Sequence, residues 1–199
     1  MIKNGIAAML ISATSLASAE AQVVDGQTYG EQRFGSWTGL YVAHADDHRF
    51  RSFAQGNGNW AISIDTVPPD CAVMVTIILS MNGESLQQDI APTDFYGVLR
   101  VDQNDVWNVK FHTQGAMGDK SMMYTAYALP GIGTLLSQMR DGQTLRAKLT
   151  VSGSDYYSTY PLNGFGSTFD AEFQTCVGAT KKAPKPKPAL QPKAGERIL

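Results

Sequence analysis

Histidine and cysteine, which often serve as nucleophiles, general bases or metal ligands, are scarce in this chain. Among 199 residues there are three histidines and two cysteines. The motifs of common enzyme classes are missing too, including the GxSxG nucleophile elbow, the phosphate-binding P-loop, the HExxH zinc motif and the EF-hand loop. The supply of general bases is therefore thin, which favours a protein without catalytic residues or a cofactor.

Long apolar runs are missing after the first residues of the chain. The longest, Ala72–Leu79, contains Thr76 and is much shorter than the roughly 20 residues that span a bilayer, so it predicts one buried strand. We expect no transmembrane segment in the mature chain. Apolar residues still make up 43% of the sequence, which is typical of a globular domain and not of a disordered chain.

Positive charge is concentrated at one end of the chain. From Gly178 onward five lysines and one arginine stand against one glutamate, although the whole chain has a net charge of −2. The remainder is therefore acidic. This balance argues against a nucleic-acid-binding domain, which would cluster lysine and arginine over one face.

The first 21 residues have the order of a secretory signal peptide. Lys3 precedes an apolar stretch from Ile6 to Leu16, and small-x-small patterns follow at residues 17–19 and 19–21. The stretch is too short to cross a bilayer, and a buried N-terminal helix is the alternative. We expect residues 1–21 to be removed on export, which leaves a periplasmic or secreted protein.

Export bears on the interpretation of Cys71 and Cys176. In an oxidising compartment two distant cysteines most often form a disulfide, and two free buried thiols are the alternative. No CxxC redox motif is present. In the chain-entropy model a bridge between positions so far apart stabilises the fold by about 4–5 kcal/mol.

Alternation of apolar and polar residues dominates the body of the chain. Residues 59–65, 107–112 and 145–151 place an apolar side chain at every second position, as a half-buried antiparallel strand requires. Turn signals separate such runs at residues 56–58, 67–70, 82–83, 102–105 and 152–155. We predict a mainly β fold of about nine or ten antiparallel strands, arranged as a β-sandwich or a barrel-like sheet.

Two segments follow a helical period instead. The apolar stripe of residues 132–139 lies between Pro130 and Gly142, which are typical of a helix start and stop. Phenylalanines recur every four residues at positions 165, 169 and 173 and predict a second helix over residues 166–175. We expect both short helices to pack on the sheet.

The C-terminal end differs in composition from the body. Residues 181–188, KKAPKPKP, have no apolar periodicity, and each proline removes a backbone donor. We predict a single domain over residues 22–177 and a disordered, extended tail over 178–199. This basic tail is either a solvated spacer or a contact for an anionic lipid, a cell-wall polymer or an acidic partner.

His44, Asp46 and His48 are candidate metal ligands. Two imidazoles and two carboxylates lie within a short stretch, and in one continuous strand these three residues would share a face. A metal ion there would indicate a metal-dependent hydrolase. The flanking residues are typical of strand, turn and strand, so a polar hairpin tip is the alternative.

Tyr156, Tyr157 and Tyr160, near Phe165, form a candidate binding patch on the strand that follows the Gly153 turn. Exposed tyrosines recognise sugars or proteins, because each offers a large area with a polar tip. The alternative is that the three side chains fill a face of the sheet or its rim.

Short motifs near both ends of the body resemble a known family. Residues 34–37, FGSW, match an F-G-x-W opening, while GQTL at 142–145 and YPLNGF at 160–165 belong to a helix, strand, hairpin and helix over residues 131–176. These features are similar to the invasion-associated locus B family of exported bacterial proteins. The resemblance implies a periplasmic or surface β-sandwich with a virulence or envelope association, and it transfers no catalytic residue.

The sequence therefore favours an exported, non-enzymatic β-sandwich of the bacterial envelope that binds a protein or an envelope component. Two other hypotheses remain open. One is the metal-dependent hydrolase, and the other is an accessory or inhibitor subunit of a secretion machine.

Overall fold

A computed structural model describes residues 27–44 and 47–182. The predicted signal peptide, Asp46 and the chain from residue 183 onward lie outside this part. The helices are α1 (Ile132–Asp141) and α2 (Phe165–Lys182). The strands are β1 (Gln27–Phe34), β2 (Trp37–His44), β3 (Asp47–Gln55), β4 (Trp60–Val67), β5 (Ala72–Ser80), β6 (Ile90–Val101), β7 (Trp107–Gly115), β8 (Ser121–Ala126), β9 (Thr144–Val151) and β10 (Ser154–Pro161).

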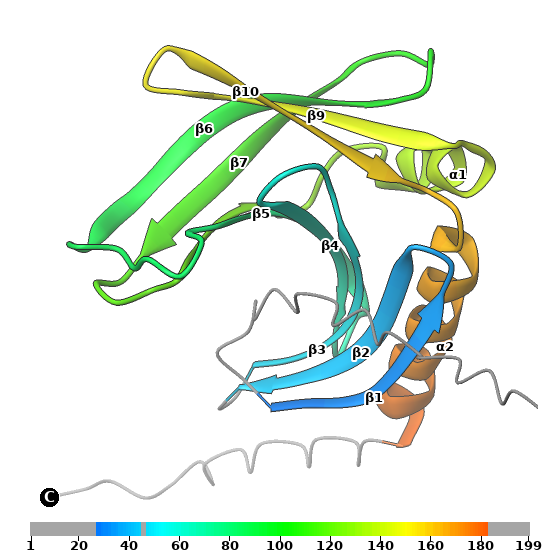
Figure 1. Cartoon of the computed structure of the whole chain (residues 1–199). Coiled ribbons are helices and arrows are strands. Elements are labelled where there is room, and N and C mark those ends of the chain that lie inside the picture. The colour runs from blue at the N-terminus through cyan, green and yellow to red at the C-terminus, as the bar shows by residue number, and fades with distance from the viewer. Residues whose placement is uncertain (1–26, 45–46, 183–199) are drawn as a thin grey trace, which may run out of the picture.

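The ten strands form one antiparallel sheet in the order β1-β2-β3-β4-β5-β8-β7-β6-β9-β10. Strands adjacent in the chain pair as neighbours, except that β5 pairs with β8 and β6 with β9. The sheet is strongly curved, so its last strand, β10, contacts β3 and β4 (Figure 1). The mainly β, antiparallel prediction and its strand count are confirmed, and the strands belong to a single sheet whose halves face each other.

The two faces of the sheet differ in what they carry. One face, which we call the core face, holds the main buried cluster, with Ile62 of β4, Ile77 of β5, Leu99 of β6, Phe111 of β7 and Leu149 of β9. The opposite face is called the outer face. The alternating segments found in the sequence form β4, β7 and β9, because alternate side chains of a strand point to opposite faces.

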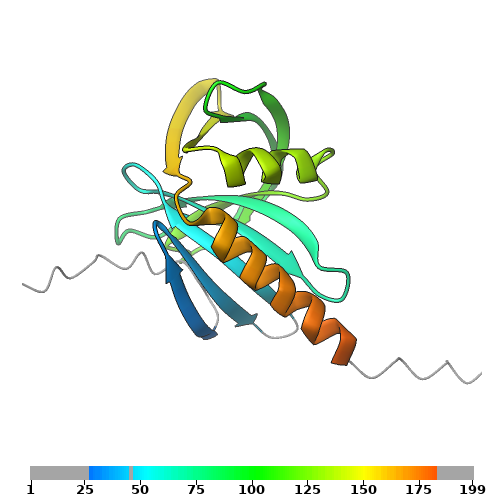
Figure 2. The same ribbon diagram turned by 90° about the vertical axis from the view of Figure 1, so that its right-hand side faces the viewer.

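Both helices pack on the core-face side, and α2 runs along β1 to β4 with α1 above it (Figure 2). Helix α1 buries Leu135, Leu136 and Met139, as the stripe predicts. Helix α2 continues past the predicted end at Thr175 to Lys182, so the predicted domain boundary after Val177 lies inside a helix. Neither of these two described helices has the length and apolar character needed to cross a membrane.

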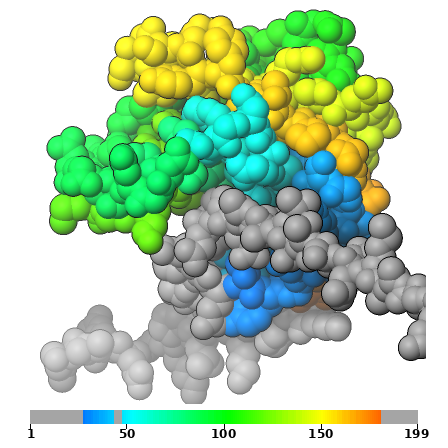
Figure 3. Space-filling model, viewed as in Figure 1, coloured from blue at the N-terminus to red at the C-terminus, as the bar shows by residue number. Residues whose placement is uncertain are grey.

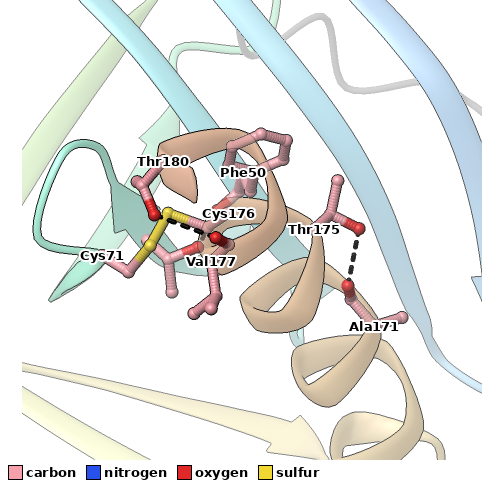
Figure 4. Close-up of a disulfide and its surroundings, with 8 residues drawn as sticks. Phe50, Cys71, Ala171, Thr175, Cys176, Val177 and Thr180 are labelled. Atoms are coloured by element: carbon pink, nitrogen blue, oxygen red, sulfur yellow. Dashed lines mark hydrogen bonds between the residues drawn. A yellow bond between two sulfur atoms is a disulfide. The ribbon is translucent and has the colours of Figure 1, made fainter. Parts of the chain in front are cut away.

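The predicted disulfide between Cys71 and Cys176 is confirmed (Figure 4). Their Cα atoms are 6.0 Å apart, and both residues are buried beside Phe50. Cys71 follows β4, whereas Cys176 lies near the C-terminal end of α2. The bridge therefore attaches the last helix to the turn between β4 and β5. It lies in the part of α2 beyond Thr175, which the phenylalanine period does not predict, and it holds that part against the sheet.

The two motif segments of the family resemblance meet in space. Ser36 donates its hydroxyl to Asn163 Oδ1 at 2.7 Å, and the Trp37 indole donates to the carbonyl oxygen of Pro161 at 2.8 Å. Gly164 has a φ of +92°, and a Cβ there would collide with the carbonyl oxygen of Phe34. The FGSW segment (34–37) and the YPLNGF segment (160–165) thus form one junction between the β1–β2 turn and the start of α2.

A buried ion pair lies on the outer face of β3 and β4. Arg51 donates from Nε and Nη2 to the two carboxylate oxygens of Asp65, both at 2.8 Å. Asp65 is 0% and Arg51 4% exposed. Burial by itself would lower the pKa of Arg51, but the charge and hydrogen bonds of Asp65 raise it. The two charges therefore depend on each other.

Candidate functional site

The outer face of β7, β6, β9 and β10 is open to solvent and carries large aromatic side chains. Tyr96 of β6, Tyr127 after β8 and Tyr157 of β10 are 69%, 60% and 65% exposed. We call these three residues and the polar side chains between them the tyrosine face. Segments of β6 (green) and of the β9–β10 hairpin (yellow) lie at the surface in Figure 3. The topology of the sheet therefore gathers tyrosines from three separate parts of the chain.

A charged cluster lies on the tyrosine face beside Tyr127. Lys110 Nζ is 2.6 Å from one oxygen of Asp94, and His112 Nδ1 is 3.2 Å from the other. These residues line a shallow hollow with Thr125 and Tyr127. Hydrogen bonds from Lys110 and His112 lower the pKa of Asp94. Asp94 is thus a fixed negative group, better suited to hydrogen bonding than to accepting a proton.

A second cluster surrounds Asp155 of β10. Thr150 donates its hydroxyl to Asp155 at 2.7 Å, Lys148 Nζ lies at 3.2 Å, and the Tyr157 hydroxyl donates at 3.3 Å. The hydrogen bonds from Thr150 and Lys148 lower the pKa of Asp155. This network orients the hydroxyl of Tyr157 and leaves its ring exposed.

The predicted patch of Tyr156, Tyr157 and Tyr160 requires correction, because these residues do not share one surface. Tyr157 is on the outer face, whereas Tyr156 lies toward the core face, 6.3 Å from the ring of Trp60 between centroids. Tyr160 is 0% exposed and its hydroxyl lies 2.8 Å from Ser158 Oγ. Burial raises its pKa. The physical reason is the strand period of two, which separates position 157 from 156 and 160.

Sequence reasoning missed the other members of the tyrosine face. Tyr96 is far from Tyr157 in the sequence, and the two lie on one face, two strands apart, because β9 pairs with both β6 and β10. Thr150 of β9 is the cross-strand partner of Tyr96 on β6 and of Asp155 on β10. Only the strand order could have revealed this grouping.

The candidate metal ligands lie on the β2–β3 hairpin. The two predicted strands are present as β2 and β3, and Asp46 lies outside the described residues. The register pairs His44 with Asp47 and His48 with Ala43. The chain reverses between the two histidines, so they occupy positions on opposite faces and not on the shared face of one continuous strand. His48 Nδ1 lies 2.8 Å from the Tyr41 hydroxyl, and metal binding stays a prediction.

Glu172 of α2 is a titratable group away from the tyrosine face. Its carboxylate lies against Gly39 of β2, and a Cβ at position 39 would displace it. Partial burial raises its pKa to about 7 from 4.5. The folded protein therefore keeps a proton that the unfolded chain has lost, and the free energy of unfolding falls as the pH rises through this interval.

Glu172→Gln should remove this loss of stability. The Tm difference, variant minus wild type, should be larger at about pH 8 than at about pH 5. At pH 8 the wild type buries a charged carboxylate, whereas the amide of the variant is neutral. Thermal unfolding followed by circular dichroism at both pH values measures the difference. A Tm difference that is the same at the two pH values would contradict the assignment.

The tyrosine face combines aromatic surface, hydrogen-bond donors and two fixed carboxylates on one exposed side of the sheet. Such a set offers aromatic contacts and hydrogen bonds to a ligand. Comparison with models of known families, with curated proteins and with solved structures found no match for this chain.

Proposed function

We propose that this chain is an exported, non-enzymatic binding protein of the bacterial envelope, and that the tyrosine face holds an envelope component. The observation that carries the proposal is the exposure of Tyr96, Tyr127 and Tyr157 on one side of the sheet. Tyrosines offer a broad ring and a polar tip, which is why they are enriched where proteins bind other molecules.

The location in the envelope has its own support. The Cys71–Cys176 disulfide is of the kind that persists in oxidising compartments such as the periplasm or the cell exterior. The order of residues 1–21 is that of a signal peptide. The resemblance to the invasion-associated locus B family agrees with an envelope protein and with a role in virulence.

The polar character of the tyrosine face favours an envelope component over a folded protein as the ligand. Thr150 and Lys148 of β9 lie between β6, which carries Tyr96, and β10, which carries Tyr157. Both donate hydrogen bonds to Asp155 of β10. The centre of a protein–protein interface is instead depleted of charged residues. Hydroxyl-rich ligands match this surface better, because each polar group there can exchange hydrogen bonds with them.

Substitution of Tyr96 and Tyr157 by alanine tests the proposal. The double variant should bind isolated bacterial cell envelopes at least about tenfold more weakly than the wild type, as is typical when tyrosine hot spots are truncated. Co-sedimentation over a range of protein concentrations measures the affinity. Tyr156→Ala is the matched control, because this neighbour on β10 lies toward the other face, and it should bind as the wild type does. Unchanged binding by the double variant would refute the proposal.

A further inference from the structure

We propose that the ligand of the tyrosine face is an acidic polysaccharide and that Arg100 and Arg146 hold its anionic groups. This inference rests on the proposed function and specifies its ligand. It starts from a pair of cations at one end of the tyrosine face that form no ion pair with a carboxylate of the described residues.

Arg100 of β6 and Arg146 of β9 are direct cross-strand partners. Like charges placed opposite each other on neighbouring strands destabilise a sheet. The Nε of Arg100 donates to the carbonyl oxygen of Asn104 at 3.0 Å, and its Nη2 donates to the backbone carbonyl and the side-chain oxygen of Gln103 at 3.3 and 3.1 Å. Nη1 of Arg146 donates to the backbone carbonyl of Asp102 at 3.0 Å. Within the described residues neither guanidinium forms an ion pair with a carboxylate. An anion bound between them would relieve their repulsion.

The nearest carboxylate along the chain is engaged elsewhere. The two side-chain oxygens of Asp102 accept the backbone N–H groups of Gln143 and Thr144, both at 2.9 Å. Asp102 thus fixes the start of β9 and offers the arginines only its backbone carbonyl. Within the described residues this leaves Nη1 of Arg100 and Nε and Nη2 of Arg146 as donors for a ligand. A guanidinium matches the geometry of a carboxylate, sulfate or phosphate.

The aromatic part of the surface continues from the arginine pair in a line. Lys148 is two residues from Arg146 and is opposite Tyr157, and Thr150 is two residues further and is opposite Tyr96. At about 3.4 Å per residue, the position of the arginine pair and that of Tyr96 are about 14 Å apart along the strands. A surface of this length accommodates several linked sugar rings, which favours a polymer over a small molecule.

The chemistry along this line fits sugar rings. The tyrosine rings offer flat surfaces for the C–H faces of sugars, and Asp155 is an acceptor for sugar hydroxyls. Asp94 and Asp155 argue against a polynucleotide, whose closely spaced phosphates need a continuous row of cations. Alternation of carboxylates and cations instead fits a chain with anionic groups at intervals and hydroxyl groups between them.

Matched probes isolate the role of charge. Oligogalacturonate is compared with its methyl ester, which has the same rings without the negative charge, by isothermal titration calorimetry at low salt. The wild type should bind the acid at least about tenfold more tightly than the ester, because charge-assisted hydrogen bonds to arginine are lost in the ester. Absence of binding to the acid, or equal affinity for both, overturns the inference.

The variant Arg100→Gln/Arg146→Gln should bind the acid at least about tenfold more weakly, with little change for the ester. Its Tm should not fall, because the substitutions remove a repulsion. The control Arg33→Gln/Lys120→Gln removes two cations from other parts of the surface, and it should bind as the wild type does. Equal losses in the two double variants would indicate a nonspecific charge effect and overturn the inference.

The two proposals fail separately. If Tyr96→Ala/Tyr157→Ala loses cell-envelope binding but the arginine variant keeps full affinity for both probes, the acidic ligand is refuted and the proposed function stands. If the tyrosine variant keeps envelope binding, the proposed function fails first. Tighter binding of oligodeoxythymidine than of oligogalacturonate would overturn the inference in favour of a nucleic acid.

Discussion

Replacement of both Cys71 and Cys176 by alanine should lower the free energy of unfolding by about 4–5 kcal/mol. The bridge joins residues 105 positions apart, so it removes a large part of the conformational freedom of the unfolded chain. Without it, α2 keeps its packing on the sheet and the junction at its start. The variant should also show a larger denaturant m-value, because a chain without the cross-link exposes more surface on unfolding.

Urea unfolding followed by tryptophan fluorescence measures this effect, since Trp37 is buried in the core. The control is the wild type treated with a reducing agent, which should match the alanine variant in both unfolding free energy and m-value. A difference between wild type and variant below about 1 kcal/mol would show that loop closure contributes little here.

Asp65→Ala should destabilise the fold by about 3–5 kcal/mol, because it leaves the buried guanidinium of Arg51 without its counter-charge. Arg51 donates two hydrogen bonds to this carboxylate and is almost fully shielded from water. The second cation near Asp65, Arg49, is partly exposed and can reach solvent. The cost therefore arises mainly from Arg51. Asp65→Asn provides a milder variant if the alanine protein does not fold.

The double variant Arg51→Met/Asp65→Leu is the matched test of this reasoning. Replacement of both charges by apolar side chains of similar volume is often neutral or stabilising, so most of the loss should be recovered. The same urea unfolding assay provides the comparison. If the double variant is as unstable as Asp65→Ala, packing at this position and not the unpaired charge is responsible.

Local patterns in the sequence were sufficient for much of the fold. Strands β4, β7 and β9 and helix α1 follow their predicted segments closely, because alternation and the 3.6-residue period mark strands and helices. The prediction that β4 is half-buried was wrong, because its outer-face residues Ser63 and Asp65 are buried as well. The disulfide followed from the predicted compartment. Strand β6 was harder, since its first residues are exposed and its pairing with β7 shifts between Ile90 and Thr93. The sequence pattern is weak where the strand leaves the core.

The candidate site was less predictable than the fold. Tyr157 was identified, but Tyr160 is a core residue, and Tyr96 and Tyr127 come from distant segments. The pairing of Arg100 with Arg146 also depends on the contact between β6 and β9. These groupings arise from the strand order, in which β8 and β7 come between β5 and β6, and no local pattern encodes that order.

The junction of the two motif segments has a consequence for how the chain acquires its structure. Ser36 and Trp37 near the start of the sheet need Asn163 and Pro161, and Cys71 needs Cys176. A chain that emerges N-terminus first, from a ribosome or from a secretion channel, cannot complete its core until nearly the whole domain has emerged. The core of such a chain therefore forms only after its C-terminal part has emerged. Until then the chain stays unfolded enough to pass through a narrow channel.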